Sequence, residues 1–384
     1  MSVTFARGFR AAGVTAGLKA SGKPDVSLVV NDGPLDNAAA VFTSNRIKAA
    51  PVQWTQQAAT TGSFKSVVLN SGGANACTGP AGFADTHHTA ERVAELLGIG
   101  AIDVAVCSTG LIGKRLPMDK LIAGVTTAVD KLSGDGGHEA AVAIMTTDSV
   151  SKTSNFESSS GWRIGGMAKG AGMLAPGLAT MLVVITTDAQ VSSADLDEAL
   201  RAATSHTFDR IDSDGCMSTN DTVLLLASGA SGIAPTQNEF HDAVSEICAD
   251  LARQLIGDAE GATKDIRITV SGAHTESDAV MVARAVSRSN LLKCAIHGED
   301  PNWGRVLSAL GTTSAAFEPD QISVDFNGVA VCRAGSALDD EPTVSLAGRE
   351  VHIDIVLNAG SESATLWTND LTAMYVHENS AYST

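Results

Sequence analysis

The segment Lys169–Gln190, KGAGMLAPGLATMLVVITTDAQ, joins a loop rich in glycine and proline to a long apolar run. The run MLVVITT is dense in β-branched residues and therefore predicts a buried strand. Thr180 stands where the loop meets this strand. Because β-branched residues are favoured in strands, the simplest interpretation of Thr180 is an ordinary residue at the start of a strand.

Short apolar segments and amphipathic segments follow one another along the whole chain. The short ones are bounded by Gly, Asn, Asp or Ser and predict strands, whereas an apolar stripe at helical spacing predicts a helix. A chain of 384 residues with 44% hydrophobic residues is long enough for two domains or lobes. The predicted fold class is α/β or α+β. Strands are expected within 25–32, 38–45, 66–72, 103–110, 321–335 and 351–360, and helices within 89–97, 192–204, 236–261 and 276–289.

Two of the predicted helices have recognisable starts. Thr89 is the expected N-cap of a helix that ends at Gly98. Thr236 and Glu239 have the spacing of a capping box, so the clearest helix is expected to begin there and to end near Gly261.

The charge balance argues against nucleic acid as a partner. Forty-three acidic side chains outnumber 26 basic ones, which gives a formal net charge of −17, and no cluster of Lys and Arg stands out in the sequence. The first residues lack the apolar core of a signal peptide, and no apolar run approaches the roughly 20 residues needed to span a bilayer. We therefore expect a cytoplasmic protein without membrane segments.

The sequence contains no recognisable metal-binding motif. The six cysteines lie far apart, without a C-x-x-C pair or a histidine at ligand spacing, and are expected to be free and mostly buried. His87 and His88 adjoin Asp85, but neighbouring residues point in different directions on a strand or a helix. We interpret them as part of a polar stretch before a helix. Neither a metal ion nor an organic cofactor is expected.

Thr180 also permits a chemical interpretation. A threonine hydroxyl is a weak nucleophile near neutral pH and needs a base within hydrogen-bond reach, yet no histidine lies in a nucleophile-elbow or triad motif. Cleavage of the bond between Ala179 and Thr180 would supply a base, because the new α-amine has a reference pKa of about 7.7–8.0. Ala179 adds little bulk beside that bond, and Pro176 and Gly177 form a rigid turn just before it.

Self-cleavage and acyl transfer both develop an oxyanion, which two hydrogen-bond donors would stabilise. The segment AVCSTGLIG is a predicted strand that runs into a turn. There, the hydroxyl of Thr109 and the backbone N–H of Gly110 could point at one position. The alternative interpretation is an ordinary β-turn.

The chain carries nine motifs in order: GFRAAGVTAGLK, NSGGANACTG, CSTGLIG, GGMAKGAGMLAP, LATML, STNDTVLLLASG, DAEGATK, GEDPNWGRVL and ENSAYST. Together they resemble the ornithine acetyltransferases of arginine biosynthesis, also called glutamate N-acetyltransferases. The resemblance covers the whole chain. Gly177 and Leu178 depart from the Asn-Met of many relatives, which puts the rate of cleavage in question but not the nucleophile.

The resemblance implies a self-cleaving precursor. Residues 1–179 would form an α chain, and residues 180–384 a β chain that begins with the nucleophile Thr180 and includes a C-terminal lobe and a docked tail. The implied fold is an N-terminal-nucleophile-like layered α/β sandwich with a smaller α/β C-terminal lobe. The implied assembly is α2β2, and no cofactor is implied.

The implied reaction is a ping-pong exchange of an acetyl group through acetyl-Thr180. Its substrates and products are N-acetylornithine, ornithine, N-acetylglutamate and glutamate; in the direction of arginine synthesis it forms N-acetylglutamate and ornithine. Some members also use acetyl-CoA as a donor, and the sequence does not separate the two kinds.

The resemblance also assigns the site residues. Thr109 and Gly110 match the oxyanion hole, and Thr146 matches a substrate contact, with Thr147 as the alternative if the register differs by one. The ammonium of Lys169 would meet a substrate carboxylate, although a lysine in a glycine-rich loop is otherwise a solvated surface residue. The full set of implied substrate contacts is Thr146, Lys169, Thr180, Glu260, Asn379 and Thr384.

Glu260 falls near a helix C-terminus, where the helix dipole disfavours a carboxylate, and this mismatch favours a role in binding the amino groups of ornithine. An exposed glutamate at a helix end is the simpler alternative.

Two rival functions remain open. One is a self-processing N-terminal-nucleophile aminopeptidase or amidohydrolase, in which water takes the acyl group. The other is a nucleotide-binding regulatory module that uses GGMAKGAG as a phosphate loop, although this segment lacks the spacing of known phosphate-binding motifs.

Overall fold

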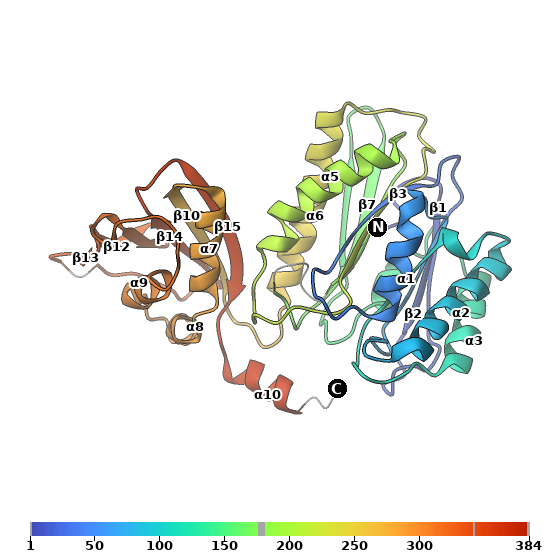
Figure 1. Ribbon diagram of the computed structural model, residues 1–384, viewed down its shortest axis with the longest axis horizontal. Coiled ribbons are helices and arrows are strands. Elements are labelled where there is room, and N and C mark those ends of the chain that lie inside the picture. Colours follow the sequence, from blue (N-terminus) through green and yellow to red (C-terminus); the bar gives the residue numbers. More distant parts are fainter. Residues whose placement is uncertain (1, 176–180, 341, 382–384) are drawn as a thin grey trace.

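The computed structural model describes residues 2–175, 181–340 and 342–381. It contains a larger lobe built on two β-sheets and a smaller C-terminal lobe built on a third (Figure 1). The last helix, α10 (Ala373–Ala381), leaves the smaller lobe and runs toward the underside of the larger one (Figure 1).

The first sheet of the larger lobe has four strands in the order β1-β2-β4-β5. Three helices cover its outer face, and their apolar side chains form one core with alternate residues of the strands. The strands are β1 (Phe9–Val14), β2 (Val26–Asn31), β4 (Ser66–Asn70) and β5 (Val104–Ser108), and the helices are α1 (Ala50–Ala58), α2 (Gly79–Leu97) and α3 (Met118–Asp130).

The second sheet has five strands in the order β3-β9-β8-β7-β6. Two long helices cover its outer face and contribute to a second core. The strands are β3 (Asn37–Phe42), β6 (Lys152–Glu157), β7 (Arg163–Lys169), β8 (Leu182–Thr187) and β9 (Thr222–Ala227), and the helices are α5 (Ser193–His206) and α6 (Gln237–Gly257).

The two sheets pack face to face, which is why their strands are buried on both sides. Val67 and Leu69 of β4 face the other sheet, whereas Val68 faces the helices. Likewise, Val184 of β8 lies between the sheets, and Val183 faces α5 and α6. This alternation follows from the two-residue period of a strand, and the strands read as continuous apolar runs because both faces are covered. The larger lobe is therefore a helix–sheet–sheet–helix sandwich.

The smaller lobe has a six-stranded sheet in the order β13-β12-β11-β14-β10-β15, and its helices pack on one face. Burial in β10 alternates over most of its length, as expected for a sheet with one covered face. The strands are β10 (Asp265–Ala273), β11 (Ser323–Phe326), β12 (Val329–Arg333), β13 (Ser336–Ala337), β14 (Glu350–Val356) and β15 (Glu362–Asn369), and the helices are α7 (Glu276–Ser287), α8 (Asn290–His297) and α9 (Trp303–Leu310).

The remaining elements are short or terminal. They are α4 (Gly137–Ala143), the C-terminal helix α10 (Ala373–Ala381) and the 3-10 turns η1 (Ala59–Thr61), η2 (Ala101–Asp103), η3 (Phe208–Arg210) and η4 (Pro319–Gln321).

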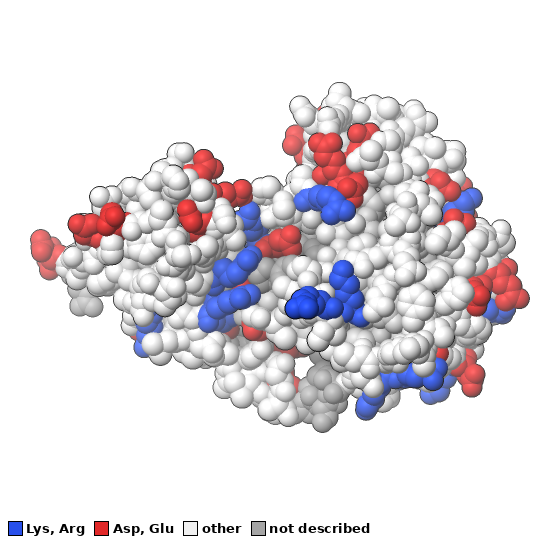
Figure 2. Space-filling view, viewed as in Figure 1, with Lys and Arg blue, Asp and Glu red and all other residues white. Residues whose placement is uncertain are grey.

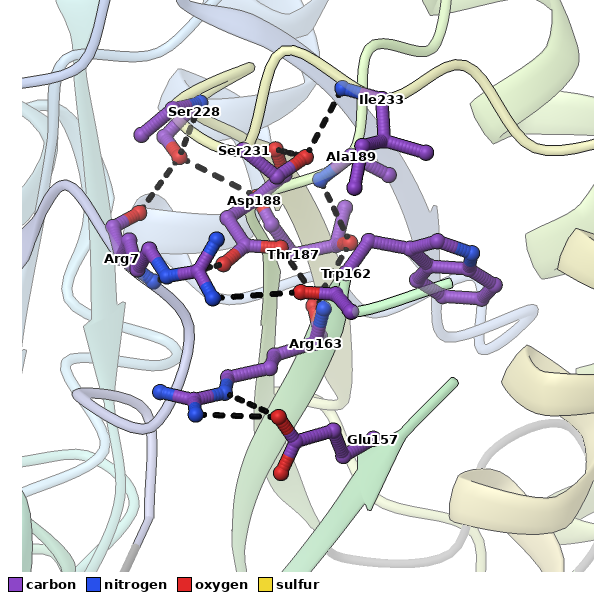
Figure 3. A network of polar contacts seen from close by, with 12 residues as sticks. Arg7, Glu157, Trp162, Arg163, Thr187, Asp188, Ala189, Ser228, Ser231 and Ile233 are labelled. Atoms are coloured by element: carbon purple, nitrogen blue, oxygen red, sulfur yellow. Dashed lines mark hydrogen bonds and ion pairs between the residues drawn. The ribbon is translucent and has the colours of Figure 1, made fainter. Parts of the chain in front are cut away.

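A buried carboxylate fixes the N-terminal segment to the second sheet (Figure 3). Asp188 follows β8 and accepts hydrogen bonds from the backbone N–H groups of Arg7 and Arg163, at 3.2 and 2.6 Å. The hydroxyl of Ser228 donates to the carbonyl of Arg7 at 2.6 Å. These bonds hold the entry to the first sheet against one end of the second (Figure 3).

The predicted fold class is confirmed: the protein is a layered α/β sandwich with a smaller α/β lobe. The capping box of Thr236 and Glu239 is also confirmed. The start predicted at Thr89 is wrong, because α2 begins ten residues earlier at Gly79 and the Thr89 hydroxyl donates to the carbonyl of Asp85. A Gly-Pro pair followed by small residues gave no amphipathic signal for this first part of the helix.

His87 and His88 consequently lie inside α2 and not before it. His87 packs against Trp54 with ring centroids 4.9 Å apart. All six cysteines are free, as predicted, but only Cys107, Cys248 and Cys332 are buried. No helix in the described ranges is long and apolar enough to cross a membrane.

Candidate active site

One cavity of about 240 Å³, here called the Thr109 cavity, collects residues that are far apart in the sequence. It lies where the ends of β5 and β7, the turn after α6 and the C-terminal helix α10 meet. Six of the predicted site residues line it: Thr109, Gly110, Thr146, Lys169, Glu260 and Asn379.

Thr109 and Gly110 follow β5 directly, and both line the Thr109 cavity. The side chain of Thr109 is 3% exposed, and its Oγ1 accepts a hydrogen bond from Nζ of Lys169 at 3.3 Å. A hydroxyl that accepts from an ammonium keeps its own hydrogen for another acceptor. The backbone N–H of Gly110 has no acceptor among the described residues. Gly110 has φ of +126°, and a Cβ there would lie 2.9 Å from the backbone nitrogen of Gly73, so no larger residue fits.

Lys169 is the last residue of β7, and its side chain is buried, with 2% exposure. The solvated surface lysine that was the alternative is therefore excluded. Burial lowers the pKa of Lys169, and the carboxylates of Asp148 and Asp221 act against that shift. Lys169 forms no ion pair within 4.0 Å with a carboxylate of the described residues, and a buried cation of this kind suits an anionic group of a ligand.

A buried ion network fixes the loop that carries Thr146. Oδ2 of Asp148 accepts from the backbone N–H of Thr146 at 2.9 Å, and its Oδ1 accepts from the N–H of Gly170 at 2.7 Å. Nζ of Lys152 donates to Asp148 at 2.7 Å and to Asp258 at 2.6 Å. Burial alone would raise the pKa of Asp148, but Lys169 and Lys152 outweigh burial and hold this pKa below its usual range.

The Asp148–Lys152–Asp258 network joins three parts of the site. It connects the Thr146 loop, the residue after Lys169 and the end of α6. Sequence reasoning missed it, because nothing in the sequence indicates that Asp258 meets the other two residues. Thr146 and Thr147 both line the Thr109 cavity, so the alternative register stays open.

Glu260 lies in the turn after α6, which ends at Gly257 and not near Gly261 as predicted. Its backbone N–H donates to the carbonyl of Ala171 at 2.9 Å, and its Oε2 accepts from Nδ2 of Asn379 at 3.0 Å. A Cβ on Gly172 would lie 2.4 Å from the same Oε2. The missing side chain at Gly172 therefore makes room for this carboxylate at the wall of the Thr109 cavity.

Asn220 and Asp221, just before β9, link the two halves of the site. Nδ2 of Asn220 donates to the carbonyls of Ala74 and Ser108 at 2.6 and 2.8 Å, which fixes the turn around Thr109. Oδ1 of Asp221 accepts from the backbone N–H of Met181 at 3.0 Å. Neither residue was assigned a role from the sequence. The motif STND was visible there, but the partners of its side chains were not.

Three predicted site residues, Ala179, Thr180 and Thr384, lie outside the described residues. The described residues on either side of 176–180, Ala175 and Met181, are buried. Among the described residues, no three His, Cys, Asp or Glu side chains are grouped so that they could hold a metal ion.

The ArgJ family model matches residues 10–384. The chain belongs to the ArgJ family. The arginine biosynthesis bifunctional protein ArgJ of Streptomyces coelicolor is 65% identical to this chain over 383 residues, and the alignment covers the full length of both chains. Its counterpart in Thermobifida fusca is 62% identical over 384 residues, again over the full length of both chains. The predicted family is thus confirmed, and so is the predicted class of enzyme, an acyltransferase of arginine biosynthesis.

Two solved structures are also similar to this ArgJ family chain. The ornithine acetyltransferase of Mycobacterium tuberculosis, complexed with ornithine, is 61% identical over 47% of this chain and 96% of that one, with a TM-score of 0.46. The arginine biosynthesis bifunctional protein of Bacillus halodurans is 35% identical over 51% of this chain and 97% of that one, with a TM-score of 0.47.

Proposed function

We propose that this protein cleaves itself between Ala179 and Thr180 and then transfers acetyl groups through the hydroxyl of Thr180. N-acetylornithine acetylates Thr180 and leaves as ornithine, and glutamate then takes the acetyl group as N-acetylglutamate. The observation that carries the proposal is the Thr109 cavity, which gathers donors for an oxyanion, a buried cation and a carboxylate.

The chemistry assigned to Thr180 balances without a cofactor. Its hydroxyl oxygen attacks the acetyl carbonyl carbon while its own α-amine accepts the hydroxyl proton. The tetrahedral oxyanion receives hydrogen bonds from the Thr109 hydroxyl and the Gly110 N–H. The C–N bond then breaks, and the proton passes from the α-ammonium to the departing amine of ornithine. Glutamate attacks the resulting ester with its amine, and the same steps run in reverse.

Ammonium and carboxylate groups in the Thr109 cavity suit amino-acid substrates. Lys169 pairs with the substrate carboxylate, since a buried ammonium gains most from an ionic hydrogen bond. Glu260, held by Asn379, pairs with an amino group of ornithine. Thr146 supplies a further polar contact, and Thr384 completes the set of contacts from the C-terminal tail.

The proposal also covers the division into two chains, their assembly and the location of the protein. Residues 1–179 form the α chain and residues 180–384 the β chain, and two of each assemble as α2β2 in the cytoplasm. Acetyl-CoA serves as a second donor for glutamate, which fits the bifunctional activity named for the relatives.

Intact-mass analysis of the purified protein tests the proposal. Two fragments divided before Thr180 are expected, and the C-terminal one should gain a single acetyl group, about 42 Da, when N-acetylornithine is added without glutamate. Addition of glutamate should remove that acetyl group and produce N-acetylglutamate. Thr180→Ala should remain uncleaved and inactive.

Two results would contradict the proposal. A chain that stays continuous through residues 179 and 180 but still forms N-acetylglutamate would require another base. Release of ornithine together with free acetate, at a rate that ignores glutamate, would indicate the amidohydrolase instead.

A further inference from the structure

A second cavity, of about 330 Å³, lies beside the Thr109 cavity and shares Glu260 as a wall. We call it the Lys293 cavity. Its residues come from both lobes: the loop after η3, the end of α7, α8, the end of β15 and α10. Figure 2 shows a hollow between the lobes with Lys and Arg side chains gathered around it and acidic side chains among them. Apart from Glu260, no residue that lines this cavity has a role in the proposed reaction.

Two basic residues, Lys293 and Arg288, line the Lys293 cavity. Lys293 is buried, and its Nζ donates to the carbonyl of Ser213 and to Oγ1 of Thr368, the latter at 3.2 Å. An ammonium has three N–H donors, so one has no acceptor among the described residues. Arg288 binds Asp212 through Nε at 2.7 Å, and its two terminal nitrogens form no hydrogen bond with the described residues. These unused donors suit a carboxylate.

Acidic residues also line the Lys293 cavity. Asp370 is one of them, and the charges of Asp214 and Asp370 both act on Lys293. The carboxylates of Asp214 and Glu260 both line the cavity, and the Tyr375 side chain lies beside them. Burial, together with the negative charges of Asp214 and Glu260, raises the pKa of Tyr375 to about 12. Burial also raises the pKa of Asp214. An ammonium between the two carboxylates would offset the unfavourable burial of negative charge.

We propose that the Lys293 cavity is a second binding site for a basic α-amino acid, with its carboxylate held by Lys293 and Arg288 and its side-chain ammonium by Asp214 and Glu260. Side chains of both charges line the cavity, so a ligand with only one kind of charge leaves the other kind unpaired. The volume is within the range of small-ligand sites.

The shared wall couples the two cavities. A ligand ammonium on the Lys293 side competes for the carboxylate of Glu260, which the proposed function uses for ornithine in the Thr109 cavity. Binding at one site therefore weakens binding at the other, and the effect is reciprocal.

Calorimetric titration of the purified protein with L-ornithine tests the inference. The wild type should bind two molecules per chain of 384 residues, and Lys293→Met should bind one. Lys169→Met should also bind one, because it removes the cation of the Thr109 cavity; this arm rests on the proposed function, whereas the Lys293 arm does not. 1,4-Diaminobutane, which lacks the carboxylate, should not fill the Lys293 cavity.

Failure of either idea is recognisable. Two results overturn the second site. In the first, the wild type binds one ornithine per chain and only Lys169→Met abolishes that binding. In the second, Lys293→Met still binds two molecules. Two molecules bound by Lys169→Met and one by Lys293→Met leave the second site intact and contradict the proposed substrate site. If Lys293→Met does not fold, Arg288→Gln, at a half-exposed position, should weaken the second binding event at least tenfold; unchanged binding overturns the proposal.

Discussion

Asp221 accepts the backbone N–H of Met181 at 3.0 Å, and its other carboxylate oxygen, Oδ2, is buried without a hydrogen-bond partner among the described residues. Burial raises the pKa of Asp221 well above its usual value, and the Met181 hydrogen bond acts against this shift. A buried carboxylate that accepts a backbone N–H restricts the position of that part of the chain. Met181 directly follows the proposed nucleophile in the sequence, so Asp221 fixes the residue next to it, just before β8.

Asp221 is therefore expected to control self-cleavage. Asp221→Ala removes the acceptor of the Met181 N–H, and we expect processing to slow about 100-fold, the effect of a displacement on the order of 1 Å at a reacting group. Asp221→Asn keeps an acceptor oxygen at the same position and should process within a few-fold of the wild-type rate. The fraction cleaved over time on a denaturing gel measures this. Equal rates for Asp221→Ala and the wild type would show that the hydrogen bond does not position the cleavage site.

Lys152 is expected to be essential for the stability of the site. Lys152→Met leaves the carboxylates of Asp148 and Asp258 without their shared cation, and loss of one partner from a buried pair costs about 3–5 kcal/mol. The free energy of unfolding in urea measures the loss. The control is Lys65→Met, because Lys65 and Asp36 are half-exposed and 4.0 Å apart, and such pairs contribute about 0–1 kcal/mol. A loss for Lys152→Met no larger than that of the control would contradict the role of the network.

A side chain at position 172 is expected to weaken substrate binding, because it would displace Glu260. A methyl group on Gly172 would meet the carboxylate of Glu260 at 2.4–2.6 Å and displace it from the Thr109 cavity. Gly172→Ala should raise the KM for N-acetylornithine about tenfold or more, which corresponds to the loss of an ionic hydrogen bond of about 1.5–3 kcal/mol. Gly134→Ala, where a Cβ meets nothing within 4 Å, is the control and should leave KM unchanged.

Lys293 should make the free energy of unfolding depend on pH in the alkaline range. Burial lowers its pKa to about 8, although Asp214, Asp212, Asp370 and Cys294 all favour the charged form. A lysine in the unfolded chain has a pKa of about 10.4 and binds the proton more strongly than the folded state does. The contribution of Lys293 to stability is therefore lowest below pH 8, and it increases as the pH rises from about 8 to about 10.5.

Comparison of the wild type with Lys293→Met isolates that contribution. The free energy of unfolding in urea is measured for both proteins at pH 7.5 and at pH 10. On going from pH 7.5 to pH 10, the free energy of unfolding of the wild type should increase relative to that of Lys293→Met by up to about 3 kcal/mol. Identical pH dependence for the two proteins would mean that Lys293 keeps an ordinary pKa in the folded state.

Local structure was largely predictable because its causes are local. The apolar run after Thr180 became β8, and the Thr236–Glu239 spacing became the N-terminus of α6, since each depends on residues within a few positions of one another. The true start of α2, at Gly79, was not predictable from the sequence. The residues between Gly79 and Thr89 have no amphipathic pattern, and tertiary packing stabilises them as a helix.

The sequence by itself determined the layered α/β class, the family and the chemical candidates, including a threonine whose own α-amine can serve as a base. Only the tertiary structure decided which of those candidates meet. Lys169 became a buried cation against Thr109, and Glu260 became the wall between two cavities, through contacts that span 60 and 119 residues of sequence. The reason is that desolvation and charge pairing act through space: the environment of an ionisable group is set by the segments folded around it, and these are not its neighbours in the chain.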